Sequence, residues 1–234
     1  ILMCVVALLA AFVGSYEQSA RAGGASWKHG FGMRDGSNLM GVAGVGIQMI
    51  EIPRKENVVD SFLMSETEIT GKQWSLVMNT YISNSSAPKT DITWLDAIRF
   101  CNALSLTNNK ASVYTIYEDR VVLDPTKNGY RLPTDDEWEY AAQGNKDGLY
   151  SGSDDLDSVA WTSHNTKGAV QRVKSKKPNT FGLYDMTGNA AEWVVSAKEC
   201  PNNSCTMNAL GSTKGGSVRS LQRDHNTVVT ASIN

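Results

Sequence analysis

The feature that most constrains the fold of this chain is a helix-start signal that occurs at Thr70, Thr93 and Thr134. At each position a threonine is followed three residues later by Gln, Asp or Glu, and an amphipathic stretch comes next. This spacing predicts a capping box, in which the two side chains satisfy backbone N–H groups at the start of a helix. We therefore expect three short amphipathic helices.

Between these helices the sequence contains short apolar runs instead of long periodic ones. Residues 47–52, 58–63 and 113–117 have the composition of strands, and turn signals lie at 124–129 and 177–179. Strands are therefore few and loops are long. We expect core aromatics and turn residues to hold such an irregular chain together.

Composition limits the classes of function. The chain has 234 residues, of which 41% are hydrophobic and 20% charged, so it can form one globular domain with a sizeable core. The formal net charge is −2, and no stripe of Lys and Arg interleaved with aromatics is present. These features argue against a nucleic-acid partner.

The N-terminal region is typical of an exported protein. Residues 1–13 form an apolar run of signal-peptide length, and Ala20-Arg21-Ala22 supplies a small-x-small cleavage pattern, so residues 1–22 are interpreted as a signal peptide. A core or anchor helix is the alternative. Residues 23–46 are Gly-rich and predict a flexible arm or a surface-packed extension, and residues 47–234 form the main domain. We expect a secreted, periplasmic or cell-surface protein without a transmembrane span in the mature chain.

In an oxidising compartment Cys200 and Cys205 would pair and close a small loop. Two free thiols or half of a zinc site are the alternatives. Cys101 lies at helical spacing with Trp94, Ala97 and other apolar residues, so we expect it to be a buried small hydrophobe.

Three sequence blocks carry a family resemblance. They are Asn128-Gly-Tyr-Arg-Leu-Pro-Thr-Asp-Asp-Glu-Trp-Glu-Tyr-Ala-Ala142, Phe181-Gly-Leu-Tyr-Asp-Met-Thr-Gly-Asn-Ala-Ala-Glu-Trp193 and Gly215-Gly-Ser217. Together they resemble the formylglycine-generating enzyme (sulfatase-modifying factor) family from roughly Met49 onward. The resemblance implies an α+β fold of the C-type-lectin-like kind, with a few short helices around small, twisted, mostly antiparallel sheets and long loops. The family's closing Gly-Phe-Arg strand does not occur before Asn234.

The resemblance also bears on catalysis. The family's enzyme activates oxygen at a copper ion held by two cysteines, and the corresponding positions here are Ser220 and His225. Cu(I) prefers soft thiolate ligands, which a hydroxyl and an imidazole do not replace. We therefore expect no bound copper and no formylglycine formation. The alternative function is a related metal-dependent oxidoreductase, with a rearranged metal centre, that modifies a protein or small molecule.

Calcium is a better candidate metal for this chain than copper. The family binds one calcium ion around its Gly-Asn-Ala-x-Glu-Trp motif, and the matching ligands are Asp185, Gly188, Ala190 and Glu192. Carboxylate and main-chain carbonyl oxygens suit this hard cation. The alternative is a metal-free turn in which Asp185 and Glu192 cap neighbouring N–H groups.

A non-catalytic member would use its C-terminal loops for binding. Residues 208–227 are rich in Ser, Asn, Thr and Arg, a composition typical of adaptable binding loops, although a solvated loop has the same composition. The candidate ligand-binding residues are Arg219, Ser220, Gln222, Arg223, His225 and Asn226. We expect a protein or glycan ligand, or copies of this chain that assemble through the arm at 23–46.

Overall fold

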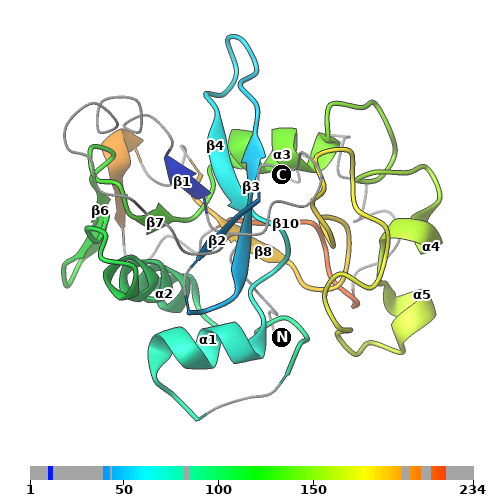
Figure 1. Ribbon diagram of the computed structural model, residues 1–234, viewed down its shortest axis with the longest axis horizontal. Helices are drawn as coiled ribbons and strands as arrows, with labels where there is room; N and C mark the ends of the chain where they lie inside the picture. The colour runs from blue at the N-terminus through cyan, green and yellow to red at the C-terminus, as the bar shows by residue number, and fades with distance from the viewer. Residues whose placement is uncertain are drawn as a thin grey trace, which may run out of the picture.

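The structure is a computed structural model, and it describes residues 10–12, 39–42, 44–81, 85–196, 201–206 and 212–219. Short helices surround small antiparallel sheets, and loops join them (Figure 1). This arrangement confirms the expected α+β fold. The helices are α1 (Gly71–Met78), α2 (Trp94–Thr107), α3 (Asp135–Gln143), α4 (Leu156–Val159), α5 (Ser163–Thr166) and the 3-10 turn η2 (Pro201–Asn203). The strands are β1 (Ala10–Phe12), β2 (Leu39–Val42), β3 (Ile47–Ile52), β4 (Phe62–Ser65), β5 (Tyr114–Ile116), β6 (Arg120–Leu123), β7 (Tyr130–Arg131), β8 (Glu192–Val194), β9 (Ser204–Thr206) and β10 (Ser212–Lys214).

The strands form three sheets. The largest has five strands in the order β2-β3-β4-β1-β7, a second has the order β5-β6-β9, and β10 pairs with β8. Every pair of neighbouring strands is antiparallel. In Figure 1, α4 and α5 lie on the opposite side of the largest sheet from α2 and β6.

The three predicted helices are confirmed, and each begins after its predicted threonine. Thr70, Thr93 and Thr134 have extended backbones, and their hydroxyls accept hydrogen bonds from the N–H groups three residues later. In each case the side chain of that later residue accepts a hydrogen bond from the threonine N–H, which completes the capping box. Glu137 at the start of α3 is therefore a capping residue of that helix.

Two of the three predicted strands lie where the sequence places them, at β3 and at β5. The prediction for 58–63 is wrong for residues 58–61, because Lys55 and Val59 close a tight turn through an N–H to carbonyl bond of 3.1 Å. Asn57 supplies the left-handed conformation of that turn, with φ 59°. The strand therefore starts later, at Phe62.

Strands β1 and β2 are not foreseen in the sequence. β1 lies inside the segment that we interpret as a signal peptide, and β2 lies inside the predicted arm. In the structure both belong to the largest sheet. Cleavage after Ala22 and the limits of the arm remain predictions.

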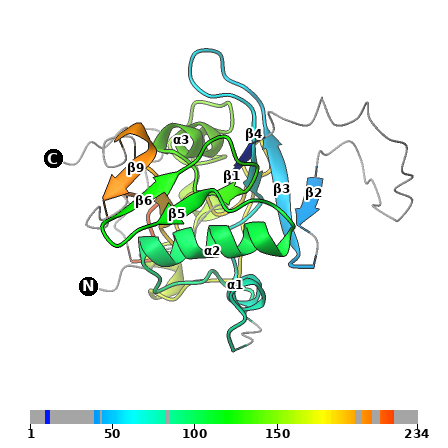
Figure 2. The same cartoon turned by 90° about the vertical axis from the view of Figure 1, so that its left-hand side faces the viewer.

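The larger core packs around α2, which lies in front of the sheets in Figure 2. Its inner face buries Ile98, Phe100 and Leu104 completely, and the Trp74 ring of α1 stacks on Phe100 with 4.7 Å between centroids. Cys101 is fully buried on the same face, which confirms its predicted role as a small core residue.

No helix in the described parts of the chain combines the length and the hydropathy that a membrane span requires.

Candidate functional site: a buried carboxylate cluster beside the loop face

The candidate site is built on a turn whose backbone is unusually tight. Asp185, Gly188 and Asn189 all have left-handed conformations, with φ of 58°, 82° and 55°. A Cβ atom at position 188 would lie 2.3 Å from the carbonyl oxygen of Trp161, so only glycine fits there. The turn can therefore pass against Trp161 and return directly into β8.

Three buried carboxylates surround this turn. Glu68 accepts hydrogen bonds from the N–H of Ala190 at 2.9 Å and from the Asn189 amide at 2.8 Å. Asp185 Oδ2 accepts the N–H of Lys174 at 2.7 Å, and Glu192 Oε2 accepts the indole N–H of Trp138. Each carboxylate is thus anchored by a donor from a different segment of the chain.

Two oxygen atoms of this cluster accept no hydrogen bond from any described residue. They are Asp185 Oδ1 and Glu192 Oε1, and both are buried. Leaving a buried acceptor without a partner costs about 1–3 kcal/mol, and more when the group is charged. A cation between them would offset that cost.

Burial also disfavours negative charge in the cluster. It raises the pKa of Asp185 to about 6. Burial raises the pKa of Glu192 well above its ordinary value, and the Asp185 carboxylate adds to this, although the Trp138 indole opposes it. The pKa of Glu68 is raised by burial and then by Asp185 and Glu192. Like charges held together in a dry site are what a bound cation would neutralise.

The chemistry of these groups fits calcium. Asp185 Oδ1 and Glu192 Oε1 supply carboxylate oxygens, and Gly188 and Ala190 place main-chain carbonyls on the turn between them. Within the described ranges, no group of three His, Cys, Asp or Glu side chains is placed to hold a metal. An ion at this turn would therefore depend on main-chain carbonyls as well as on the two carboxylates.

The three sequence blocks meet at this turn. The Gly188 N–H donates to the carbonyl of Gly215 at 2.8 Å, and the Val218 N–H donates to the carbonyl of Asn189 at 3.0 Å. A Cβ atom at Gly215 would lie 3.3 Å from the Trp138 ring. The motif turn (residues 185–190), the Gly-Gly-Ser block and Trp138 of α3 therefore lie against one another.

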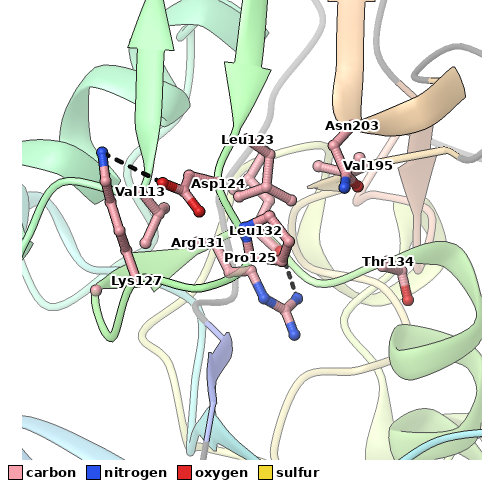
Figure 3. A pocket seen from close by; sticks show the side chains of 11 residues that line it. Val113, Leu123, Asp124, Pro125, Lys127, Arg131, Leu132, Thr134, Val195 and Asn203 are labelled. Atoms are coloured by element: carbon pink, nitrogen blue, oxygen red, sulfur yellow. Dashed lines mark hydrogen bonds and ion pairs between the residues drawn. The ribbon is translucent and has the colours of Figure 1, made fainter.

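A separate pocket of about 180 Å³ lies between β6, β7 and the end of β8 (Figure 3). Val113, Leu123, Leu132 and Val195 make it largely apolar. In Figure 3 the ion pair between Asp124 and Lys127 flanks one side, and Asn203 lies on the other, beside Val195. Val195 and Asn203 come from the chain that follows Glu192, where the sequence places the binding face.

The other predicted site residues are only partly described. Arg219 is exposed, and its backbone N–H donates to the Ser217 hydroxyl at 3.2 Å. The candidate ligand residues Ser220, Gln222, Arg223, His225 and Asn226 lie outside the described residues, as does Cys200. Cys205 is buried on β9, and its pairing with Cys200 stays a prediction.

Sequence reasoning missed Glu68. It lies more than a hundred residues before the motif turn, and Glu66, two residues earlier, forms an ordinary ion pair with Lys174 at 2.6 Å. No spacing in the sequence shows which of these two glutamates belongs to the site. The one available signal is that Glu68 directly precedes a buried isoleucine and the threonine that starts α1.

Comparison with known proteins shows that the sequence matches a protein family. Residues 26–231 match the sulfatase-modifying factor enzyme 1-like domain. Chaperone protein LppX of Paenibacillus barcinonensis is 33% identical over 200 residues, which is 67% of this chain and 71% of that protein. Inactive C-alpha-formylglycine-generating enzyme 2 of Bos taurus is 36% identical over 81 residues, or 29% of this chain and 27% of the relative.

Solved structures of other proteins have the same fold as this chain. Treponema denticola variable protein 1 superposes with a TM-score of 0.68 and 27% identity, covering 84% of this chain and 92% of that one. The structure of PvdO from Pseudomonas aeruginosa has a TM-score of 0.60 at 16% identity and covers 84% of this chain and 92% of its own, so it supports the fold alone.

Proposed function

Because the chain belongs to the sulfatase-modifying factor enzyme 1-like family, we propose that it is an exported, non-catalytic member that acts as a ligand-binding or structural module of the cell surface or envelope. The observation that carries this proposal is the identity of two residues. Ser220 and His225 occupy the positions that the resemblance assigns to copper-binding cysteines. Function follows the residues of a site and not the fold, so the loss of both thiols removes the oxidase chemistry.

A copper-binding experiment tests directly whether the protein is non-catalytic. We expect the wild-type protein to bind no stoichiometric Cu(I) when titrated anaerobically against a chelator, and to leave a cysteine-containing sulfatase peptide unmodified. The double variant Ser220→Cys/His225→Cys restores both thiols, so it serves as the matched positive control and should gain one copper ion. A wild-type protein that binds one copper and oxidises the peptide would establish the oxidoreductase alternative.

The working face of the module would comprise the loops after Glu192. The apolar pocket supports this location, because Val195 and Asn203 contribute to it. A pocket with an apolar interior and a polar rim is typical of ligand sites in proteins. The relative named as a chaperone supports a protein ligand over a small substrate.

Pocket variants can test this face. Val195 is nearly buried at the pocket, so Val195→Trp would fill the pocket, whereas Leu149→Trp changes an exposed hydrophobic residue that does not line it. We expect retention of a purified candidate protein or glycan by the immobilised chain to fall at least tenfold for Val195→Trp and to be unchanged for Leu149→Trp. Equal retention by both variants would remove the pocket from the proposal.

Calcium would be the structural ion of this module. Asp185 and Glu192 each have one buried carboxylate oxygen without a hydrogen-bond partner among the described residues. When bound there, the ion would supply positive charge that holds the turn and β8 in place. Native mass spectrometry of protein purified from its source reports this ion, the mature terminus and the stoichiometry in one spectrum. A multimer or a partner complex with calcium, or without metal, supports a binding or structural module.

A further inference from the structure

The inference concerns the orientation of Glu192 at the motif turn. Its Oε2 atom accepts the indole N–H of Trp138, whereas its buried Oε1 atom has no hydrogen-bond partner among the described residues. The torsion that turns a glutamate carboxylate has a broad, roughly two-fold energy profile, so packing alone does not fix the plane of the two oxygens. The hydrogen bond from Trp138 therefore decides which oxygen is held and which stays without a partner.

Trp138 is itself held in one position. Its side chain is almost completely buried on α3, in the core cluster that includes Leu183 and Met186. A Cβ atom at Gly215 would lie 3.3 Å from Cζ2 of the indole ring, so the chain that follows β10 closes off the ring on that side. The indole N–H is therefore a fixed donor that sets the orientation of the Glu192 carboxylate.

Asp185 is held in the same way as Glu192, and Glu68 is not. Asp185 Oδ2 accepts the N–H of Lys174 at 2.7 Å, and Oδ1 has no partner among the described residues. Both oxygens of Glu68 accept hydrogen bonds from the motif turn. An indole has a single N–H and accepts no hydrogen bond, so it occupies only one carboxylate oxygen. The donors thus leave one oxygen of Asp185 and one of Glu192 available to an ion, whereas those of Glu68 are engaged.

We propose that Trp138 is a positioning residue for a calcium ion at the motif turn, because its indole N–H holds Glu192 with Oε1 available to the ion. Trp138 would not bind the ion itself, since an indole offers a donor and no acceptor. Removal of a residue that orients a metal ligand typically lowers metal affinity about 10–100-fold. The inference rests on the calcium site of the proposed function, and it adds a residue of α3 that controls the affinity of that site.

The calcium affinity of a phenylalanine variant tests this role. Trp138→Phe removes the N–H but keeps an aromatic ring in the core. Trp74 is also a buried tryptophan, but it belongs to the other core cluster and stacks on Phe100, so Trp74→Phe is the matched control for lost ring volume. In isothermal titration with CaCl2 we expect Trp138→Phe to raise the Kd at least tenfold and Trp74→Phe to leave it unchanged. An unchanged Kd in Trp138→Phe, or an equal increase in both variants, would overturn the proposal.

The indole N–H gives a second readout, which a purely structural role of the ring would not move. The chain has six tryptophans, and each contributes one indole signal to a proton–nitrogen correlation NMR spectrum. Because the carboxylate that accepts the Trp138 N–H would share its charge with the ion, we expect the Trp138 signal to shift when calcium is added and the Trp74 signal to stay. A Trp138 signal that stays in place while wild-type protein binds calcium contradicts the role. This measurement uses wild-type protein, so it decides the question even if Trp138→Phe fails to fold.

The outcomes separate this inference from the proposed function. Calcium bound equally well by wild type and Trp138→Phe removes the positioning role and leaves the calcium site in place. A wild-type protein that binds no calcium overturns both. Neither result affects the copper titration or the Val195→Trp experiment, because Trp138 does not line the pocket and is not one of the two positions that the copper experiment changes.

Discussion

At the scale of single residues, the molecule depends on a few buried polar atoms whose partners come from distant parts of the chain. Glu68 holds the backbone of Ala190, and Trp138 holds Glu192. The lone Asp185 Oδ1 and Glu192 Oε1 are the exceptions to this pairing. Two buried carboxylate oxygens without partners, one in the motif turn and one at the start of β8, are the strongest physical sign of a cation site among the described residues.

Calcium should therefore raise the stability of the wild-type protein. We expect millimolar CaCl2 to raise the midpoint of thermal unfolding by several degrees relative to EDTA, because an ion bound only by the folded state stabilises it. Asp185→Asn and Glu192→Gln should abolish the shift. Asp60→Asn, which changes an exposed carboxylate, is the control and should keep it. A calcium shift that survives Asp185→Asn would place the ion elsewhere.

Gly188 should tolerate no side chain. In Gly188→Ala the new methyl would meet the Trp161 carbonyl at 2.3 Å, and the backbone is also left-handed. Gly168 has nearly the same φ, 80°, but open space around it, so Gly168→Ala measures the backbone cost alone. We expect Gly188→Ala to lose about 2 kcal/mol more than Gly168→Ala in urea unfolding, a typical cost of overpacking. Equal losses would mean that the turn can move away from Trp161.

The ion pair of Arg131 and Glu137 should give a pH-dependent contribution to stability. Burial alone would raise the pKa of Glu137, but hydrogen bonds and charge from Arg131 outweigh it and lower the pKa. A lowered pKa in the folded state means that the stabilisation is present at neutral pH and is lost as the carboxylate becomes protonated in acid.

Glu137→Gln tests this contribution, because Gln keeps the helix-cap acceptor but removes the charge. It leaves Arg131 buried without its partner, so we expect a loss of about 3 kcal/mol at pH 7. The difference from wild type should shrink below pH ~4. Asp119→Asn removes an exposed partner of Arg120 and should change little at either pH. If the stability difference between Glu137→Gln and wild type did not depend on pH, the charge of Glu137 would not be what stabilises the fold.

At the scale of helices and strands, the parts predictable from sequence are those that local chemistry decides. Capping boxes involve residues three apart, so Thr70, Thr93 and Thr134 locate their helices without any tertiary information. β1 and β2 could not be located this way, because their pairing depends on distant strands and their sequences are apolar or Gly-rich. Glu68 was missed for the same reason.

The cap of α2 offers a matched pair of threonines. Thr93→Ala removes the capping hydroxyl and should cost about 1 kcal/mol. Thr107 lies exposed at the other end of the same helix, where its hydroxyl donates to the Ala103 carbonyl. Since alanine is the better helix former, Thr107→Ala should be neutral or slightly stabilising in urea unfolding. A neutral Thr93→Ala would show that packing alone fixes the start of α2.

At the scale of the whole molecule, the cysteines should report the folded state and the predicted disulfide together. Cys101 is fully buried, and burial raises the pKa of its thiol far above the ordinary value. We expect native protein to resist N-ethylmaleimide. In urea without reductant Cys101 should react while Cys200 and Cys205 do not, and reductant should expose those two. Labelling of Cys200 and Cys205 without reductant would contradict their pairing.

The pairing of β8 with β10 has a consequence for how such a molecule could acquire new partners. The two strands lie side by side, with Val194 opposite Ser212, so the chain leaves the scaffold and returns to it at adjacent points. Lengthening a loop whose ends are already held together costs only about 0.6 kcal/mol per doubling of its length. β9 lies between these anchors and its Cys205 belongs to the core, so insertions and substitutions there that spare β9 could change what the protein recognises while the motif turn, α3 and the core keep their structure.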